Sequence, residues 1–256
     1  MLKINHSAGF FSCCSVKLYN IIRHFNKYKK LPEIINYENE FDMYNPFNKS
    51  ITNDFFETNN MNILYTEFVD FYLLYQFNYY NRIKYNQLNI FIEKYFTLSQ
   101  EIIDIKNSLL EKYKIDQHNC IALYYRGTDK IVETKLGPFL EYYQYVEHII
   151  KKNPNIILLV QTDSQLFIDF IKSKYTNIII ISELQSSYNN IGTHFQNNKL
   201  ENYNQIKYLL ATIHIISECK YIVTSSGNCS LWALLYRGNS NNVYQYLENK
   251  FIQSIT

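Results

Sequence analysis

Polar side chains suited to phosphate chemistry follow three short apolar runs of the sequence. They form the groups Arg126–Lys130, Thr162–Ser164 and Thr224–Asn228. An arginine can bind a phosphate through two parallel N–H groups. Small residues and a glycine before a helix expose backbone N–H groups at the positive end of the helix dipole. Together the three groups predict a site for a nucleoside diphosphate that needs no metal. The residues expected to bind it are Arg126, Asp129, Thr162, Asp163, Ser225, Ser226, Gly227 and Asn228.

The apolar runs themselves predict strands. Cys120–Tyr125, Ile156–Gln161, Asn177–Ile181 and Tyr221–Thr224 are continuous and short, as strands covered on both faces are. Segments with helical spacing alternate with them, and this order is typical of an α/β fold with a parallel sheet. Ligands of such sheets bind beyond the carboxyl ends of the strands, where all three polar groups fall. The helices are expected at about 138–152, directly after Thr162–Ser164, at 201–217 and at Cys229–Tyr236.

The first part of the chain has a different pattern, and we place a boundary near residue 116. It separates an N-terminal domain, 1–116, from a C-terminal Rossmann-like domain, 117–256. The loop Gly9–Ser12 precedes an amphipathic helix, and Ser99 is a plausible N-cap for a helix over 100–114. Dense apolar residues predict two more helices, at 61–76 and 83–97, whereas 31–50 gives no firm assignment.

Each polar group also has an ordinary structural explanation. Ser-Ser-Gly-Asn is most often a turn with a helix cap, and Asp163 could be the N-cap of the next helix. Arg126 and Asp129 could form a local ion pair without a ligand. His148 and His214 fit structural or solvated roles, while His194, in a polar loop, is more open to a substrate role. Only the joint position of the groups at strand ends favours a ligand site.

Composition excludes several classes of protein. A net charge of +2 over 256 residues, with both signs interleaved, predicts neither a nucleic-acid partner nor a membrane surface. Lys3 and His6 interrupt the N-terminal apolar residues, so no signal peptide or membrane segment is predicted, and we expect a soluble, cytoplasmic-type protein. The five cysteines, at positions 13, 14, 120, 219 and 229, form no zinc pattern and suggest reduced thiols. The 25 tyrosines make arguments from single aromatic residues weak.

Residues 118–238 resemble a known family, the core α1,6-fucosyltransferases and nodulation fucosyltransferases and, more distantly, protein O-fucosyltransferases. Tyr124-Tyr-Arg-Gly-Thr-Asp-Lys130 is similar to the family's His-Val-Arg-Arg-Thr-Asp-Lys. Val160-Gln-Thr-Asp163 is similar to its Ala-Thr-Asp-Asp run. Ile213-His214 with Tyr221-Ile-Val-Thr-Ser-Ser226 resembles its Ile-His-Phe-Leu-Ser helix and the strand and serine-rich turn that follow.

The resemblance implies a GT-B fold, in which two Rossmann-like domains face each other across a cleft. It implies an inverting, metal-independent transfer of a sugar, with GDP-fucose favoured as donor, to a glycan or protein acceptor. Arg126 would neutralise the diphosphate, and Lys130 and Glu133 would act on the acceptor hydroxyl, with Glu133 as general base. Glu133 stands one position nearer to Lys130 than the family's glutamate. Gly9 and Phe10 would lie close to the cleft and, with His194, form a candidate substrate loop.

Departures from the family pattern affect the base of the donor more than its phosphates. Tyr124 stands in place of the first histidine and Gly127 in place of the second arginine. Thr212 replaces the aspartate that reads guanine, and Ser164 replaces a second aspartate after the strand. Two alternatives therefore stay open beside the fucosyltransferase: a transferase that uses another nucleotide sugar, and a catalytically inactive protein of the same fold that binds glycan or nucleotide.

Overall fold

The computed structural model describes residues 1–47, 49–61 and 67–253. Its largest sheet has five strands in the order β6-β5-β7-β8-β9, of which the first four run parallel and β9 is antiparallel to β8. All six residues of β5 are buried because helices cover both faces of the sheet. The strands are β5 (Cys120–Tyr125), β6 (Ile157–Thr162), β7 (Tyr221–Ser225), β8 (Val243–Leu247) and β9 (Lys250–Gln253).

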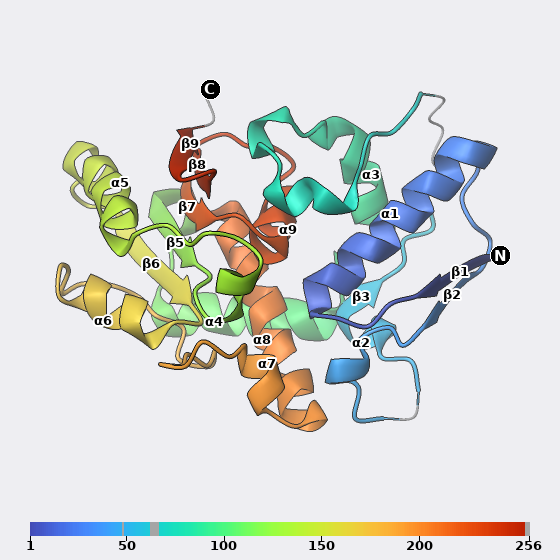
Figure 1. Cartoon of the computed structure of the whole chain (residues 1–256), viewed down its shortest axis with the longest axis horizontal. Coiled ribbons are helices and arrows are strands. Elements are labelled where there is room, and N and C mark those ends of the chain that lie inside the picture. Colours follow the sequence, from blue (N-terminus) through green and yellow to red (C-terminus); the bar gives the residue numbers. More distant parts are fainter. Residues whose placement is uncertain (48, 62–66, 254–256) are drawn as a thin grey trace.

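Successive side chains of β5 point to opposite faces of the sheet and join two apolar clusters. Leu123 and Tyr125 pack with Tyr142 and Phe167 of the helices α5 and α6. Ala122 and Tyr124 belong to the cluster on the opposite face, which contains the helices α8 and α9. Figure 1 shows α8 and α9 between this sheet and the N-terminal part of the chain. The helices are α5 (Phe139–Lys152), α6 (Gln165–Lys172), α7 (Thr193–Gln196), α8 (Lys199–Glu218) and α9 (Asn228–Arg237).

The N-terminal part contains a small parallel β-α-β unit. The strands β1 and β2 pair in parallel, and the long helix α1 connects them. A second pair, β3 and β4, is antiparallel. The elements are β1 (Leu2–Asn5), α1 (Phe10–Tyr28), β2 (Ile35–Glu38), α2 (Thr52–Phe55), β3 (Phe56–Glu57), α3 (Tyr85–Tyr95), β4 (Thr97–Leu98) and α4 (Gln100–Tyr113). Short 3-10 turns, η1 to η5, are Asp42–Tyr44, Leu73–Phe77, Tyr80–Arg82, Gln117–Asn119 and Asp129–Val132.

One apolar cluster runs through both parts of the chain. Phe11 of α1 stacks on Trp232 of α9 with ring centroids 6.0 Å apart, and Trp232 is fully buried. Its indole Nε1 donates to Ser15 Oγ at 2.9 Å, and Ser15 Oγ donates to Asn228 Oδ1 at the same distance. These contacts fix the N-terminal end of α1 against the N-terminal end of α9. The domain boundary near residue 116 stays a prediction.

The predicted α/β class and the parallel sheet are confirmed, and three of the four predicted strands lie within about one residue of β5, β6 and β7. The fourth, Asn177–Ile181, is wrong: only Ile179 forms an isolated parallel bridge, to Leu159. The helix expected at 61–76 is wrong for residues 67–76, while 62–66 lie outside the described residues. Here the backbone N–H and C=O of Val69 bond to the side chain of Asn26 instead of continuing a helix.

Among the described residues, no helix combines the length and the apolar character needed to cross a membrane.

Candidate functional site

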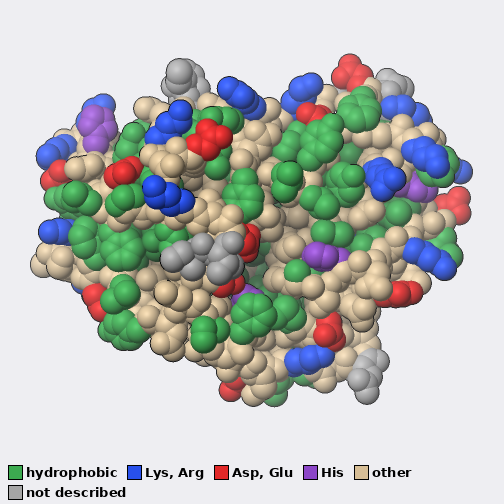
Figure 2. All heavy atoms as spheres, viewed as in Figure 1, with side chains coloured by type: hydrophobic (Ala, Val, Ile, Leu, Met, Phe, Trp, Pro, Cys, Tyr) green, Lys and Arg blue, Asp and Glu red, His purple; other side chains and the backbone are tan. Residues whose placement is uncertain are grey.

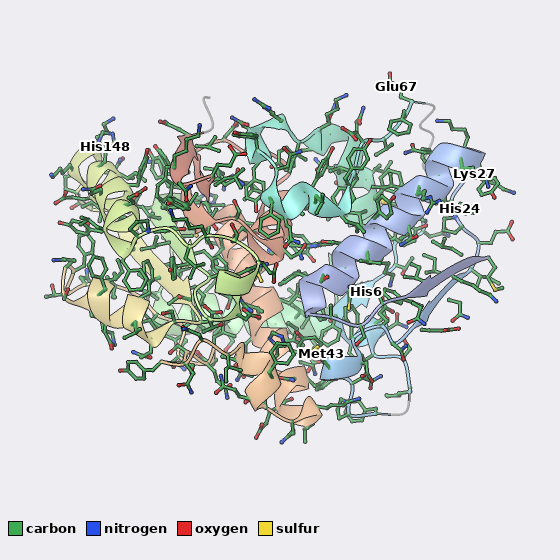
Figure 3. All side chains as sticks on the ribbon, viewed as in Figure 1. His6, His24, Lys27, Met43, Glu67 and His148 are labelled. Atoms are coloured by element: carbon green, nitrogen blue, oxygen red, sulfur yellow. The ribbon has the colours of Figure 1, made fainter. Side chains whose placement is uncertain are left out.

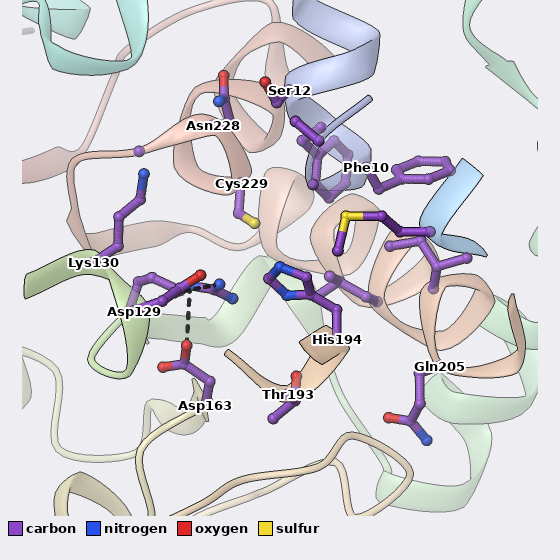
Figure 4. A pocket seen from close by; sticks show the side chains of 18 of the residues that line it. Phe10, Ser12, Asp129, Lys130, Asp163, Thr193, His194, Gln205, Asn228 and Cys229 are labelled. Atoms are coloured by element: carbon purple, nitrogen blue, oxygen red, sulfur yellow. Dashed lines mark hydrogen bonds and ion pairs between the residues drawn. The ribbon is translucent and has the colours of Figure 1, made fainter. Parts of the chain in front are cut away.

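The three polar groups predicted at strand ends line one cavity of about 560 Å³, a size ordinary for small-molecule sites. It lies between the carboxyl edge of the large sheet and the first residues of α1, so both parts of the chain form its wall. Figure 2 shows the surface hollowed near the middle of the view, with acidic side chains at the rim, and Figure 4 shows the interior. Predicted residues that line it are Gly9, Phe10, Arg126, Asp129, Lys130, Glu133, Thr162, Asp163, His194, Ser226, Gly227 and Asn228.

Arg126 leaves the end of β5 and is held by two carboxylates. Its Nε lies 3.0 Å from Asp163 Oδ2, and an Nη2 proton is donated to Asp129 Oδ1 at 2.7 Å. Burial alone lowers the pKa of the guanidinium, but Asp163 above all, with Asp129, raises it well above its usual value, so Arg126 stays charged. Two of its five N–H donors are used, and the other three have no partner among the described residues.

Asp163 organises this strand end and does not cap the following helix. It accepts hydrogen bonds from Gly127 N at 2.7 Å and Thr128 Oγ1 at 2.6 Å, in addition to its contact with Arg126. The cap of α6 is Ser164, whose Oγ accepts from Phe167 N. The side chain of Asp163 is only 7% exposed, so its charge is directed at the loop after β5.

The first turn of α9 offers unpaired backbone donors to the cavity. The amides of Asn228, Cys229 and Ser230 donate to no other described residue, and all three residues line the cavity. The helix begins after Gly227, whose φ of +155° is a backbone conformation found almost only in glycine. Free N–H groups and the helix dipole therefore point at the same space as the charged arginine.

The serines before α9 hold this loop in place. Ser225 Oγ accepts from Arg126 N at 3.1 Å, and Ser226 Oγ donates to Tyr246 O at 2.7 Å. Gly227 N donates to the hydroxyl of Tyr80, which comes from the N-terminal part. These hydroxyl and amide groups already have protein partners, so their role is to shape the turn.

Lys130 and Glu133 form an ion pair that lines the cavity next to this turn. Lys130 Nζ lies 2.5 Å from Glu133 Oε2, donates to Gln76 Oε1 at 3.3 Å and stands over the ring of Phe77. The glycine at 227 makes room for it, because a Cβ there would lie 3.1 Å from Lys130 Cε. The ammonium group is thus fixed beside the first turn of α9 by residues of both parts of the chain.

Gly9, Phe10 and His194 are near one another, as expected for a substrate loop, but they contribute differently. The Phe10 side chain is 2% exposed and stacks on Phe41, so only its backbone side faces the cavity. Gly9 is the N-cap residue of α1. His194 reaches the same space from α7, with its ring 6.5 Å from that of Tyr44.

Among the described residues, no group of three or more His, Cys, Asp and Glu side chains is placed to hold a metal ion. The metal-free site stays a prediction. The five cysteines, all within the described segments, form no disulfide, and four of them are buried. Cys229, which is half-buried and lines the cavity, has its pKa raised by burial.

No protein-family model and no curated protein matches the sequence. Solved structures do match. NodZ α-1,6-fucosyltransferase soaked with GDP-fucose is 13% identical, with 68% of this chain and 55% of that chain covered and a TM-score of 0.44. Fucosyltransferase NodZ from Bradyrhizobium is 12% identical, with 63% of this chain and 49% of that chain covered and a TM-score of 0.39. A mutant of Arabidopsis thaliana FUT1 in complex with GDP is 14% identical, with 65% of this chain and 38% of that chain covered and a TM-score of 0.41.

The chain spans about half the length of the NodZ structures it matches.

Sequence reasoning missed the N-terminal side of the site. Gln76, Tyr80 and Ser15 come from this side and hydrogen-bond to cavity-lining residues, namely Lys130, Gly227 and Asn228 respectively. Each is separated from its partner by more than 50 positions and belongs to no motif, so no local pattern indicates it. The sequence assigned Cys229 and Ser230 to a helix but not to the site. Their amides are free because both residues lie in the first turn of α9.

Proposed function

We propose that the chain binds a nucleotide sugar through its diphosphate and transfers the sugar to an acceptor hydroxyl, as a glycosyltransferase. One observation carries the proposal: the fixed guanidinium of Arg126 shares a cavity with three unpartnered amides of α9. A diphosphate would take the three free N–H donors of Arg126 together with these amides. Lys130 would add a second positive charge beside the bond that breaks.

Sugar transfer is supported by the position of the cavity as well as by its charges. It lies between the two parts of the chain, which leaves one wall for the donor and the other, with Gly9 and Phe10, for an acceptor. The fold of the matched fucosyltransferases suggests GDP-fucose as the first donor to test, with a glycan or protein as acceptor. Since Thr212 is fully buried and does not line the cavity, it offers no contact for a guanine base. Other nucleotide sugars therefore belong in the same test.

A binding protein without turnover is the second candidate, and one contact favours it. Glu133, the base predicted from the sequence, already shares its carboxylate with Lys130 at 2.5 Å. A non-catalytic protein would be stabilised by nucleotides and would release no sugar.

The first experiment measures thermal unfolding with GDP, UDP and their sugars, together with alkylation of Cys229. At 100 times its dissociation constant, a ligand adds about 2.7 kcal/mol, which raises Tm by roughly 5–10 °C for a chain of this size. Because Cys229 is the one cysteine that is not buried, a bound diphosphate should also slow its alkylation. Arg126→Ala should abolish both effects, and the exposed Arg23→Ala serves as matched control. If no nucleotide changes Tm or alkylation, the proposal is wrong.

Donor hydrolysis then separates the two candidates. Release of sugar from GDP-fucose, or from the donor that gives the largest shift, indicates a transferase. Stabilisation without release by the wild-type protein indicates a binding protein.

A further inference from the structure

An imidazole without a protein partner faces the cavity. His194 lies in α7, and neither of its ring nitrogens hydrogen-bonds to another described residue. Figure 4 shows the ring of His194 across the open space from Asp129, Asp163 and Cys229. A side chain placed in this way can meet a ligand without first breaking a contact within the protein.

The backbone that carries this imidazole is held by a buried side-chain amide. Asn202 of α8 is 4% exposed, and its Nδ2 donates to His194 O at 2.8 Å and to Met43 O at 3.1 Å. Gly192, two residues earlier, lies so close to the site that a Cβ there would be 2.8 Å from Asp129 Oδ2. Asn202 therefore ties the backbone of His194 to Met43 of the N-terminal part, and Gly192 brings the same segment close to Asp129.

The charges around His194 favour its neutral form. Burial is the largest effect on its pKa and, with the positive charge of Arg126, lowers it from 6.5, while Asp129 and Asp163 raise it by less. Tyr44, the other titratable group beside the ring, stays neutral because burial raises its pKa. At pH 7 the imidazole is uncharged and able to accept a proton.

Glu133 is placed less well for the same task. Its carboxylate is bound to the ammonium of Lys130, and 43% of its side chain is exposed. To accept a hydroxyl proton, this carboxylate would have to give up part of its contact with the ammonium, whereas the imidazole of His194 has no such partner. The contact fits a different role, in which Glu133 keeps Lys130 beside the first turn of α9.

We propose that His194 is the general base of the transfer reaction. It takes the proton of the acceptor hydroxyl while the hydroxyl oxygen bonds to the anomeric carbon of the sugar. The bond from this carbon to the diphosphate oxygen breaks, and its electron pair leaves with the diphosphate, which Arg126 and Lys130 neutralise. This assignment rests on the proposed glycosyltransferase function. It gives His194 the role of general base that the sequence analysis assigned to Glu133.

The experiment compares His194→Gln with His148→Gln and Glu133→Gln. His148 is an exposed residue of α5, far from the cavity-lining Met43 in Figure 3, and is the matched control. The readouts are the kcat of donor hydrolysis, with water as acceptor and GDP-fucose or the best donor of the panel as substrate, and the Tm shift with GDP or UDP. Loss of a general base should lower kcat about 10²–10⁴-fold in His194→Gln and leave the Tm shift in place. His148→Gln should match the wild type in both.

A pH profile adds a readout that a structural role would not change. In the wild type, kcat should rise with pH through the lowered pKa of His194 and level off by about pH 7. This limb should be lost in His194→Gln, and added imidazole should restore part of the rate in His194→Gly.

If the kcat of His194→Gln is within threefold of the wild-type value and still rises with pH in the same way, the assignment is overturned. It is equally overturned if Glu133→Gln alone loses turnover. A wild-type Tm shift that persists in either case keeps the proposed function. If the wild type shows no shift with any nucleotide, both proposals fail.

Discussion

Removing the carboxylate of Asp163 should destabilise the fold as well as the site. Asp163 accepts from Gly127 N, Thr128 Oγ1 and Arg126 Nε at 2.7, 2.6 and 3.0 Å. Asp163→Ala leaves these three donors without that partner in a place where the aspartate side chain is 7% exposed. Loss of one member of a buried pair costs about 3–5 kcal/mol. For a chain of this size, that corresponds to a fall in Tm on the order of 6–20 °C.

Urea and thermal unfolding of three variants test this reasoning. Asp163→Asn keeps one acceptor oxygen and should cost less, about 1–3 kcal/mol. The control is Asp42→Ala, because the pair of Asp42 with Lys199 is about half exposed on both sides and is worth roughly 0–1 kcal/mol. Equal losses for Asp163→Ala and Asp42→Ala would refute the view that Asp163 organises the strand end. Nucleotide-induced stabilisation should be lost in Asp163→Ala and kept in Asp42→Ala.

Two further predictions concern the turn before α9 and the loss of stability at low pH. Gly227→Ala should lower the free energy of unfolding by about 1–3 kcal/mol and weaken nucleotide binding, because φ at this position is +155° and the added Cβ would press on Lys130. The control is Gly9→Ala, where φ is −54° and the nearest atom to an added Cβ lies at 3.9 Å. It should cost far less in the same unfolding assay. For Asp129, burial raises the pKa but Arg126 lowers it further, so the folded value lies below the unfolded one. Its contribution is present above the unfolded pKa of about 4 and is lost as pH falls through the folded value, so Asp129→Asn should differ from the wild type at pH 7 and lose that difference toward pH 3. A constant difference across this range would contradict the coupling to Arg126.

The strands of the large sheet could be predicted where burial on both faces leaves a continuous apolar run. Cys120–Tyr125 is such a run, and all its residues are buried. Val243–Leu247 was missed because its polar centre, Gln245, does not suit a buried strand. Gln245 is 2% exposed, but it donates to Asn78 O and Ser226 Oγ and accepts from Tyr80 N. Partners this distant in sequence decide the burial of a polar residue, and no local pattern contains them.

The opposite error occurred at Asn177–Ile181. Four consecutive isoleucines predict a strand, yet the segment bonds to the sheet only through Ile179. This residue donates to Leu158 O and accepts from Val160 N, both at 2.8 Å. The apolar run reports burial against the edge of the sheet, whereas a regular strand requires hydrogen bonds along its length. The composition of the segment indicates its burial and leaves its hydrogen bonding undetermined.

The candidate site was predictable where strand ends meet and unpredictable where the two parts of the chain meet. Parallel strands β5 and β7 are neighbours, so Arg126 and the turn after Ser225 had to lie together, and Arg126 N does bond to Ser225 Oγ. The partners of Asp163 could not be chosen from the sequence, because a helix cap and a buried ion pair need the same residue type. The structure resolves this alternative through Ser164, which takes the cap.

The balance of charge in the cavity explains why the carboxylates and the free amides occur together. Two cations, Arg126 and Lys130, face three carboxylates, Asp129, Glu133 and Asp163, so the side chains alone do not attract an anion. The carboxylates instead fix the direction of both cations and leave three N–H donors of Arg126 open. The additional positive potential comes from the first turn of α9, whose amides carry partial charge without desolvating another ion. A diphosphate bound there would be held by groups that are already oriented, which is the condition under which a leaving group gains most from its site.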